Sequence, residues 1–256
     1  MTTPLASESI GTGRRLVLCH GFTQNRACWG PFADDLARDH EVVLIDAPGH
    51  GDSGHDEADL DDSAALVGDV GGRAIYVGYS MGGRTALHLA LARPALVEGL
   101  VLIGATAGLD SEAERQARRS ADEALAARLL DEGIETFIDR WLAGPLFAEL
   151  SPAVAARAVR LRNRPEGLAA SLRSVGTGSQ RSLWPLLAGL RMPVSVVAGQ
   201  SDDKFRVLAN RLVDSIGPNA TAEFIDGGHA VHLVSPAASA SAVRRLVQRV
   251  EVDTEG

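Results

Sequence analysis

The stretch VGYSMGGRT, residues 77–85, places one serine between glycines where an apolar run gives way to a helical one. Its centre matches the pattern G-x-S-x-G, with Ser80 in the middle. At a sharp turn between a strand and a helix the serine oxygen is exposed, and larger side chains in place of the glycines would collide. The pentapeptide alone arises often by chance, but its position between a strand and a helix predicts a reactive serine.

Six short apolar runs, rich in β-branched residues, alternate with amphipathic segments along the chain. Such runs are typical of strands buried on both faces of a parallel sheet, and the segments between them have the periodicity of helices. The expected fold is α/β, with a mostly parallel sheet, crossover helices and a single domain. The expected strands are residues 14–20, 41–47, 73–79, 97–104, 193–199 and 222–227, and the expected helices are residues 29–39, 59–70, 80–92, 204–216 and 235–252.

The alternation stops between residues 108 and 185, where the sequence is rich in Ala, Arg and Leu, has helical periodicity and contains no expected strand. Helices are expected there at residues 110–133 and 134–150. We interpret residues 108–185 as a helical cap inserted into a core formed by residues 1–107 and 186–256. Active sites of such sheets lie at the carboxyl ends of the strands, so a cap predicts an enclosed pocket.

The composition excludes several classes of protein. The chain has 33 acidic and 25 basic residues, a formal net charge of −8 and 4% aromatic residues, which argues against nucleic-acid binding. Two cysteines, Cys19 and Cys28, are too few for a disulfide scaffold or a metal cage. No signal-peptide pattern and no apolar run of about 18 residues is evident. We expect a soluble cytoplasmic protein without metal or cofactor, monomeric or weakly homo-oligomeric.

An activated serine requires an imidazole, and the imidazole requires a carboxylate that fixes its tautomer. In this kind of sheet the chain order is serine, acid, histidine. Asp202 and Asp203 follow the strand at residues 193–199, and Asp202 is preferred. Asp226, at the end of the last strand, is a remote third candidate. The 229 − 202 = 27 residues from Asp202 to His229 leave room for one helix and one strand, which places both groups on neighbouring loops.

The choice of histidine follows from position. His229 comes after two glycines at the end of a strand, where a loop side chain can reach over the serine. His232 lies three residues further on and is expected to begin the last helix, so His229 is preferred. His88 lies on the apolar face of a helix and is interpreted as a packing residue. His50 and His55 lie in a glycine-rich loop and are expected to be exposed.

The first expected strand ends in His20, Gly21 and Phe22. Backbone N–H groups at this position lie beside the serine in such folds, so the N–H groups of Phe22 and Met81 are predicted to form an oxyanion hole. His20 is interpreted as stabilising the turn. The loop DAPGHGDSG, residues 46–54, is expected to serve mainly as a turn.

Together these segments resemble the α/β-hydrolase-fold family over nearly the whole chain. Within it the sequence is similar to the 2-succinyl-6-hydroxy-2,4-cyclohexadiene-1-carboxylate synthases of menaquinone biosynthesis. Any one of the matching segments indicates only the fold, but their combination is specific. The segments are HGFTQNRACW, DAPGHGDSG, GYSMGGRTAL, ERQARRSADEALA, W-x-x-x-PLF at residues 141–147, LRN, GLAASLRSVGTGSQRSLW, DDKF and GHAVHL.

The resemblance implies an elimination rather than a hydrolysis. Pyruvate leaves an enolpyruvyl cyclohexene carboxylate, and a succinyl cyclohexadiene remains. A ring proton next to the succinyl ketone is removed, and the electrons expel the enolpyruvyl oxygen without an acyl-enzyme. Ser80, activated by His229 and Asp202, serves as the base or its relay, while the oxyanion hole receives the charge that develops on the ketone oxygen.

A substrate with several carboxylates requires cations, and the resemblance points to five basic residues. Arg84 lies one helical turn after the serine, and Lys204 directly follows the acid loop. Arg118 and Arg119 both lie in the cap, and either aligns with the family's cap arginine. Arg162 lies further along the cap; without the resemblance, cap arginines at helical spacing are usually a solvated face. The residues expected to supply pocket wall and hydrogen bonds are Tyr79 and Trp141.

Two other functions compete with the synthase. A serine hydrolase that cuts an ester or a carbon–carbon bond needs the same triad. A non-catalytic module that binds a ligand is disfavoured, because Ser80, Asp202 and His229 are all present. An esterase is expected to have an apolar acyl pocket, so the basic residues favour a small polycarboxylate as substrate.

Overall fold

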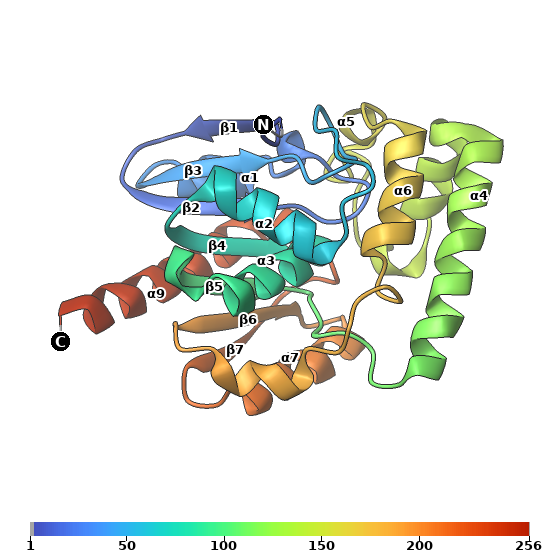
Figure 1. Ribbon diagram of the computed structural model, residues 1–256. Coiled ribbons are helices and arrows are strands. Elements are labelled where there is room, and N and C mark those ends of the chain that lie inside the picture. The colour runs from blue at the N-terminus through green and yellow to red at the C-terminus, as the bar shows by residue number, and fades with distance from the viewer. Residues whose placement is uncertain (1–2, 256) are drawn as a thin grey trace.

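The computed structural model describes residues 3–255, with side chains up to residue 252. At its centre lies a seven-stranded sheet in the order β1-β3-β2-β4-β5-β6-β7 (Figure 1). All neighbouring strands are parallel except β1, which is antiparallel to β3. The sheet is that of the α/β-hydrolase fold expected from the sequence. Its strands are β1 Ser7–Ile10, β2 Arg14–Cys19, β3 His40–Ile45, β4 Ala74–Tyr79, β5 Val97–Ile103, β6 Val194–Gly199 and β7 Ala220–Ile225.

The edge strand β1 is absent from the sequence-based prediction. Its four residues, SESI, are exposed or half-buried and lack the apolar run that marks the other strands. β1 is held at the edge of the sheet by backbone pairing, with Ser7 opposite Ile45 and Ile10 opposite Val42. Because backbone pairing requires no particular side chains, hydrophobic patterning does not reveal such a strand.

Helices cover both faces of the sheet (Figure 1). α2 and α3 contact each other on one face, whereas α1 and α9 contact each other on the other face. Alternate strand side chains enter two separate apolar clusters, with Val17 in one and Leu16 in the other, as the pleat of a strand requires. The core helices are α1 Pro31–Leu36, α2 Leu60–Gly71, α3 Met81–Ala92, α7 Asp203–Ile216, α8 Val231–Val234 and α9 Pro236–Glu255, and the 3-10 helices are η1 Arg26–Cys28, η2 Pro94–Leu96, η3 Pro145–Phe147 and η4 Trp184–Gly189.

Between β5 and β6 the chain forms the helices α4 Glu112–Leu142, α5 Arg157–Arg160 and α6 Pro165–Val175. In Figure 1, α4 and α6 stand side by side beyond one end of the sheet. Ser111 and Glu114 form a capping box at the start of α4. Two helices were expected over residues 110–150, and α4 is interrupted at Gly133, whose φ of 79° and ψ of 166° are not helical, so two helices meet there at a kink. The second ends at Leu142 rather than at residue 150.

No helix among the described residues is long and apolar enough to span a lipid bilayer.

Candidate active site

Ser80 occupies the turn between β4 and α3. Its backbone, with φ 51° and ψ −108°, lies where residues other than glycine are rarely found, and strain of this kind clusters at reactive sites. The neighbouring glycines make the turn possible. A Cβ on Gly78 would lie 2.5 Å from the carbonyl oxygen of Gly82, and a Cβ on Gly82 would lie 1.9 Å from that of Cys19. The Ser80 side chain makes no capping bond to α3, which leaves Oγ available to another partner.

Ser80, His229 and Asp202 form one hydrogen-bonded chain. His229 Nε2 lies 3.2 Å from Ser80 Oγ, and His229 Nδ1 lies 2.9 Å from Asp202 Oδ2. Because the carboxylate accepts, Nδ1 carries the imidazole proton and Nε2 accepts from the serine hydroxyl. Asp202 Oδ1 also accepts from the N–H of Phe205 at 3.2 Å, which fixes the orientation of the carboxylate. This is the arrangement that activates a serine.

The other two acids considered from the sequence lie elsewhere. The Asp203 side chain is 94% exposed and pairs with an arginine of its own helix. Asp226 contributes its backbone carbonyl, which accepts from the Ser235 hydroxyl at 2.7 Å. Asp202 is therefore the carboxylate that contacts His229.

The remaining histidines of the sequence analysis are packed into the fold. His232 is buried, its ring centroid lies 4.3 Å from that of Tyr79, and neither ring nitrogen has a partner among the described residues. His88 is buried, as its apolar helix face predicts, and bonds to Asp61 Oδ1 at 2.7 Å. The expectation of an exposed His50 is wrong, because its side chain is completely buried.

The cap explains the burial of His50. The loop that carries His50 packs against α6, and a Cβ on Gly49 would lie 2.7 Å from the carbonyl oxygen of Gly167. Burial lowers the pKa of His50 to about 3, so the imidazole is neutral, and Nδ1 lies 2.9 Å from the carbonyl oxygen of Pro48. His55 is half-buried rather than exposed, with Nε2 at 2.6 Å from the carbonyl oxygen of Thr3.

The two predicted oxyanion donors, Phe22 and Met81, line the cavity that contains Ser80. Within the described chain, no protein acceptor bonds to either backbone N–H. The N–H of Met81 is the first in α3, where the helix dipole favours negative charge. His20 supports the turn, since Nε2 accepts from the N–H of Ala47 at 3.0 Å. Two free donors beside the serine suit a developing oxyanion.

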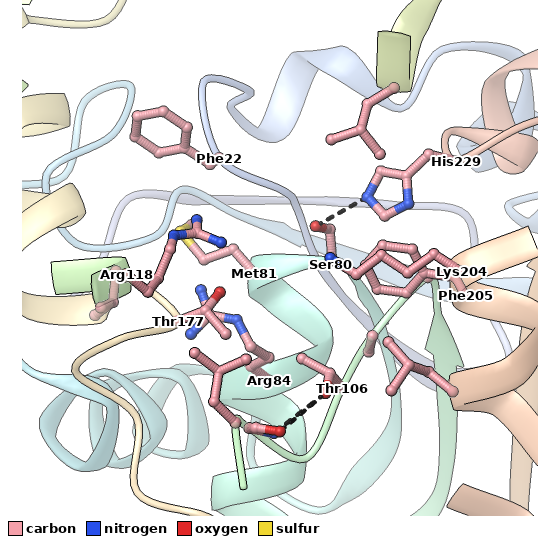
Figure 2. A pocket seen from close by; sticks show the side chains of 18 of the residues that line it. Phe22, Ser80, Met81, Arg84, Thr106, Arg118, Thr177, Lys204, Phe205 and His229 are labelled. Atoms are coloured by element: carbon pink, nitrogen blue, oxygen red, sulfur yellow. Dashed lines mark hydrogen bonds between the residues drawn. The ribbon is translucent and has the colours of Figure 1, made fainter. Parts of the chain in front are cut away.

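The triad opens into a cavity of about 340 Å³ whose lining includes residues of the core and of the cap (Figure 2). Figure 2 shows Arg118 on one side of Ser80 and Lys204 on the other, with Arg84 below. Phe22, Trp141 and Phe147 contribute apolar wall, whereas Asp110, Glu114 and Arg211 add further charges. The cavity therefore combines an activated serine with three basic side chains predicted from the sequence.

Arg84 is the most deeply placed of these cations, with 7% of its surface exposed. Its Nη1 lies 3.4 Å from Gln180 Oε1, and within the described chain it pairs with no carboxylate. Burial and, after it, the charge of Arg118 lower the pKa of Arg84 to about 10. Asp122, which is bonded to Arg118, is the one described carboxylate whose charge partly offsets these effects. A buried guanidinium with no carboxylate bonded to it is costly, and a carboxylate ligand would reduce that cost.

Arg118 and Lys204 are more accessible. Arg118 Nε donates to Asp122 Oδ1 at 2.8 Å, and the Asp122 side chain is only 4% exposed. This bond leaves the Arg118 Nη groups directed to the cavity without a protein acceptor in the described region. Lys204 Nζ lies 5.5 Å from the ring centroid of Phe205, and no described carboxylate pairs with it.

Two predicted substrate-binding arginines do not line this cavity. Arg119 lies one residue past Arg118, which turns it about 100° around the helix, and it bonds to Glu112, to Gln116 and to the carbonyl oxygen of Gly178. Arg162 is exposed and lies outside the cavity lining. Neither side chain belongs to the cavity lining of this structure, so a role of either in substrate binding stays a prediction.

Arg160, two residues before Arg162, is a buried arginine that was not predicted from the sequence. Arg160 is 1% exposed and donates to the hydroxyl of Thr23 and to the carbonyl oxygen of Ala155. Its Nη2 is buried and has no partner among the described residues. The alternation VRLRN, residues 159–163, offers both arginines, and only the placement of the cap separates them.

Tyr79 and Trp141, expected as pocket wall, both line the cavity. Burial raises the pKa of Tyr79, so its hydroxyl stays neutral. The ring of Tyr79 lies with its centroid 5.4 Å from that of His229. Among the described residues, no group of three or more His, Cys, Asp or Glu side chains is arranged to hold a metal ion.

Comparison with known proteins agrees with this geometry. A model of the α/β hydrolase family matches residues 16–242. The chain is 33% identical to a putative 2-succinyl-6-hydroxy-2,4-cyclohexadiene-1-carboxylate synthase of Bacillus subtilis (strain 168), over 91% of this chain and 89% of that protein. It is 32% identical to the 2-succinyl-6-hydroxy-2,4-cyclohexadiene-1-carboxylate synthase of Enterobacter sp. (strain 638), over 91% of each chain.

Solved structures include MenH from S. aureus, similar with a TM-score of 0.89 and 29% identity over 96% of this chain and 98% of that chain. The structure of a thermophilic esterase from Thermogutta terrifontis is also similar to this chain, with a TM-score of 0.80 and 25% identity over 96% of this chain and 93% of that chain. The chain therefore belongs to the α/β hydrolase family and, within it, to the 2-succinyl-6-hydroxy-2,4-cyclohexadiene-1-carboxylate synthases.

Proposed function

We propose that the protein is a lyase of menaquinone biosynthesis. It eliminates pyruvate from 2-succinyl-5-enolpyruvyl-6-hydroxy-3-cyclohexene-1-carboxylate and releases 2-succinyl-6-hydroxy-2,4-cyclohexadiene-1-carboxylate. One observation carries this proposal: Arg84, Arg118 and Lys204 share a cavity with Ser80 and His229. The family to which the chain belongs supports the same reaction.

Charge matches the cavity to this substrate. The substrate has three carboxylates, on the succinyl chain, on the ring and on the enolpyruvyl group. Four basic residues line the cavity: Arg118 pairs with Asp122 and Arg211 with Asp110, whereas Arg84 and Lys204 have no carboxylate partner among the described residues. This local positive charge stands in a chain whose formal net charge is −8. Guanidinium groups bind carboxylates through paired hydrogen bonds, so Arg84 and Arg118 are the principal anchors.

The triad removes a proton rather than attacking a carbonyl carbon. Ser80 Oγ takes the ring proton next to the succinyl ketone while its own proton passes to His229 Nε2, 3.2 Å away. The Asp202 carboxylate, bonded to Nδ1, stabilises the imidazolium that results. Ser80 Oγ therefore becomes a base only as its own proton is transferred to His229.

The electrons of the broken C–H bond move first onto the ketone oxygen, where the N–H groups of Phe22 and Met81 receive the negative charge. They then shift through the ring double bond and break the bond between the ring carbon and the enolpyruvyl oxygen. The leaving enolate takes the proton held by His229 and becomes pyruvate, so atoms and charge balance without water. The ring is left with two conjugated double bonds.

A serine hydrolase is the alternative function. The triad geometry serves both reactions, and the esterase from Thermogutta terrifontis shares the fold at 25% identity. An ester hydrolase gains little from Arg84 and Arg118 beside its serine, because an acyl chain is apolar. The cations therefore favour elimination.

The deciding experiment supplies the enolpyruvyl precursor to the purified enzyme and measures pyruvate by coupling to lactate dehydrogenase. Pyruvate should form with the wild-type enzyme and not with the Ser80→Ala variant. If no pyruvate forms while simple esters are cleaved efficiently, the hydrolase is the correct function. Ester cleavage alone, lost in Ser80→Ala, would show that the triad works and that only the substrate is misassigned.

We propose roles for the cap and the core, and a location for the reaction, on the same basis. Residues 108–185 act as the cap that closes the site over a core of residues 1–107 and 186–256. The partner is a small polycarboxylate, and neither nucleic acid nor a membrane takes part. A substrate with three negative charges does not cross a bilayer unaided, so we place the reaction in the cytoplasm, where the protein acts as a monomer or weak homo-oligomer.

A further inference from the structure

Asn163, in the short connection between α5 and α6, ties the cap to the loop that follows β2. Its side chain is 4% exposed. Nδ2 donates to the carbonyl oxygen of Thr23 at 2.8 Å, to that of Gln24 at 3.4 Å and to that of Arg160 at 2.9 Å. Oδ1 accepts from the N–H of Gly51 at 2.7 Å. One amide therefore joins three separate segments of the chain.

The loop that Asn163 holds is strained. Thr23 has φ 67°, a left-handed conformation that β-branched residues rarely adopt, so its surroundings must enforce it. Two cap residues supply that restraint, because Asn163 binds the Thr23 carbonyl and Arg160 binds its hydroxyl. A third hydrogen bond between this loop and the cap is donated by Asn25 Nδ2 to the carbonyl oxygen of Val159 at 2.9 Å.

Thr23 directly follows Phe22, whose N–H is one of the two oxyanion donors. That N–H belongs to the Gly21–Phe22 peptide, whose carbonyl oxygen accepts from the N–H of Gln24 at 3.1 Å. The Gln24 N–H belongs in turn to the peptide whose carbonyl, that of Thr23, accepts from Asn163. Fixing the Thr23 carbonyl therefore also fixes the peptide that carries the donor. The loop lies close to the serine, since a Cβ on Gly82 would meet the carbonyl oxygens of Cys19 and His20 at 1.9 and 2.7 Å. A small rotation of the Thr23 peptide therefore changes the oxyanion hole.

We propose that Asn163 is a positioning residue for the oxyanion hole: through the Thr23 carbonyl, this cap side chain holds the Phe22 N–H where negative charge develops. The inference rests on the proposed function for its substrate but on the hydrogen bonds of Asn163 for its mechanism. It makes the cap part of the catalytic apparatus as well as a cover for the site.

The first test compares Asn163→Ala with Arg164→Ala. Arg164, the next residue, ties the same cap segment to a neighbouring exposed loop through Asp56 at 2.7 Å and serves as the matched control. In the pyruvate assay, kcat of Asn163→Ala should fall roughly 10- to 100-fold with KM changed less than about threefold, because the oxyanion donor acts on the transition state. Arg164→Ala should keep kcat within about twofold. An unchanged kcat in folded Asn163→Ala overturns the inference.

Asn163→Asp removes the amide donor to Thr23 but keeps an acceptor for the Gly51 N–H. Its buried carboxylate faces the carbonyl oxygens of Thr23 and Arg160, so the variant should melt below the wild type, and kcat is measured at a temperature at which the variant is folded. Its kcat should fall at least as far as in the alanine variant. Full activity of Asn163→Asp contradicts the inference, because the bond to Thr23 would then be dispensable.

A second probe works without the proposed substrate. A fluorophosphonate labels an activated serine when Oγ displaces fluoride, and its phosphoryl oxygen occupies the oxyanion hole. The rate of Ser80 labelling should fall about tenfold or more in Asn163→Ala and stay unchanged in Arg164→Ala. If wild-type enzyme fails to release pyruvate but shows this difference in labelling, the proposed substrate fails and the role of Asn163 stands. Equal labelling rates in wild type and folded Asn163→Ala refute that role.

Discussion

Arg84 lies on the helix that begins beside the serine and Arg118 on the cap, yet both guanidinium groups face one cavity. Burial and, after it, the charge of Arg118 lower the pKa of Arg84 to about 10. Two like charges held this way are unfavourable until an anion lies between them. The unliganded enzyme therefore carries an electrostatic cost that a polycarboxylate relieves on binding.

Replacing Arg84 by methionine tests that relationship. Arg84→Met keeps much of the side-chain volume and removes the charge, so kcat/KM for pyruvate release should fall roughly 100-fold, the loss expected for a buried carboxylate contact of about 3 kcal/mol. The free energy of unfolding of the unliganded protein should not decrease, because the removed charge has no carboxylate partner among the described residues. Steady-state kinetics and urea unfolding measure both effects.

Arg119→Met is the matched control. Arg119 has the same side chain and lies in the cap, but it bonds to Glu112, Gln116 and a backbone carbonyl away from the cavity. Its kcat/KM should stay within about threefold of the wild type, as for most exposed charges. Equal losses in the two variants would mean that general charge, and not the cavity, determines substrate use.

Asp202→Asn should separate the triad acid from its neighbour. The amide keeps the shape but no longer stabilises the imidazolium of His229, so kcat should fall by roughly 10³- to 10⁴-fold with a small change in KM. Asp203→Asn, whose side chain is 94% exposed, should remain within about twofold. The pyruvate assay gives both values. A larger loss in Asp203→Asn would overturn the assignment of the acid.

The position of Lys204 predicts that substrate binding depends on ionic strength. Its exposed ammonium lines the cavity and has no carboxylate partner in the described chain, so it attracts the anionic substrate through solvent and is screened by salt. Raising the salt concentration should raise KM of the wild type, and Lys204→Gln should raise KM several-fold while flattening that salt dependence. Arg206→Gln, on the same helix but paired with Asp203, should keep the wild-type salt dependence. An unchanged salt response in Lys204→Gln would contradict this role.

The triad could be predicted from the sequence because its geometry follows from the topology of the sheet. Parallel strands end at the same edge of the sheet, so groups that follow β4, β6 and β7 must meet there. Ser80, Asp202 and His229 each follow one of these strands directly. Neither the cap nor any long-range contact is needed to infer that they converge.

The arginines that face the cavity were harder to predict, because their positions depend on how the cap is oriented against the core. Periodicity places Arg118 and Arg119 on one helix, but which of them faces the cavity is set by packing between α4 and α6. The same packing buries Arg160, leaves Arg162 exposed and covers the loop of His50. Local sequence patterns contain no information about such docking.

Buried neutral histidines predict how stability changes with pH. Burial lowers the pKa of His20 to about 4 and those of His50 and His232 to about 3, below the usual value near 6.5. Below pH 6.5 the unfolded chain therefore binds protons that the folded protein does not. The contribution of these neutral histidines to the free energy of unfolding is fully present above about pH 6.5. It decreases as the pH falls below 6.5, by about 2 kcal/mol per histidine between pH 7.5 and 5.

His232→Phe tests this dependence where the side chain makes no hydrogen bond. His232 lies among aromatic rings, with centroids at 5.0 Å from Trp29, 5.9 Å from Phe32 and 4.3 Å from Tyr79. Phenylalanine keeps an aromatic ring and cannot titrate, so urea unfolding at pH 7.5 and pH 5 should show a difference smaller by about 2 kcal/mol than in the wild type. Leu233→Ala is the control, because it lowers stability equally at both pH values and leaves the difference unchanged. If His232→Phe retains the whole wild-type difference, protonation of His232 does not contribute to acid unfolding.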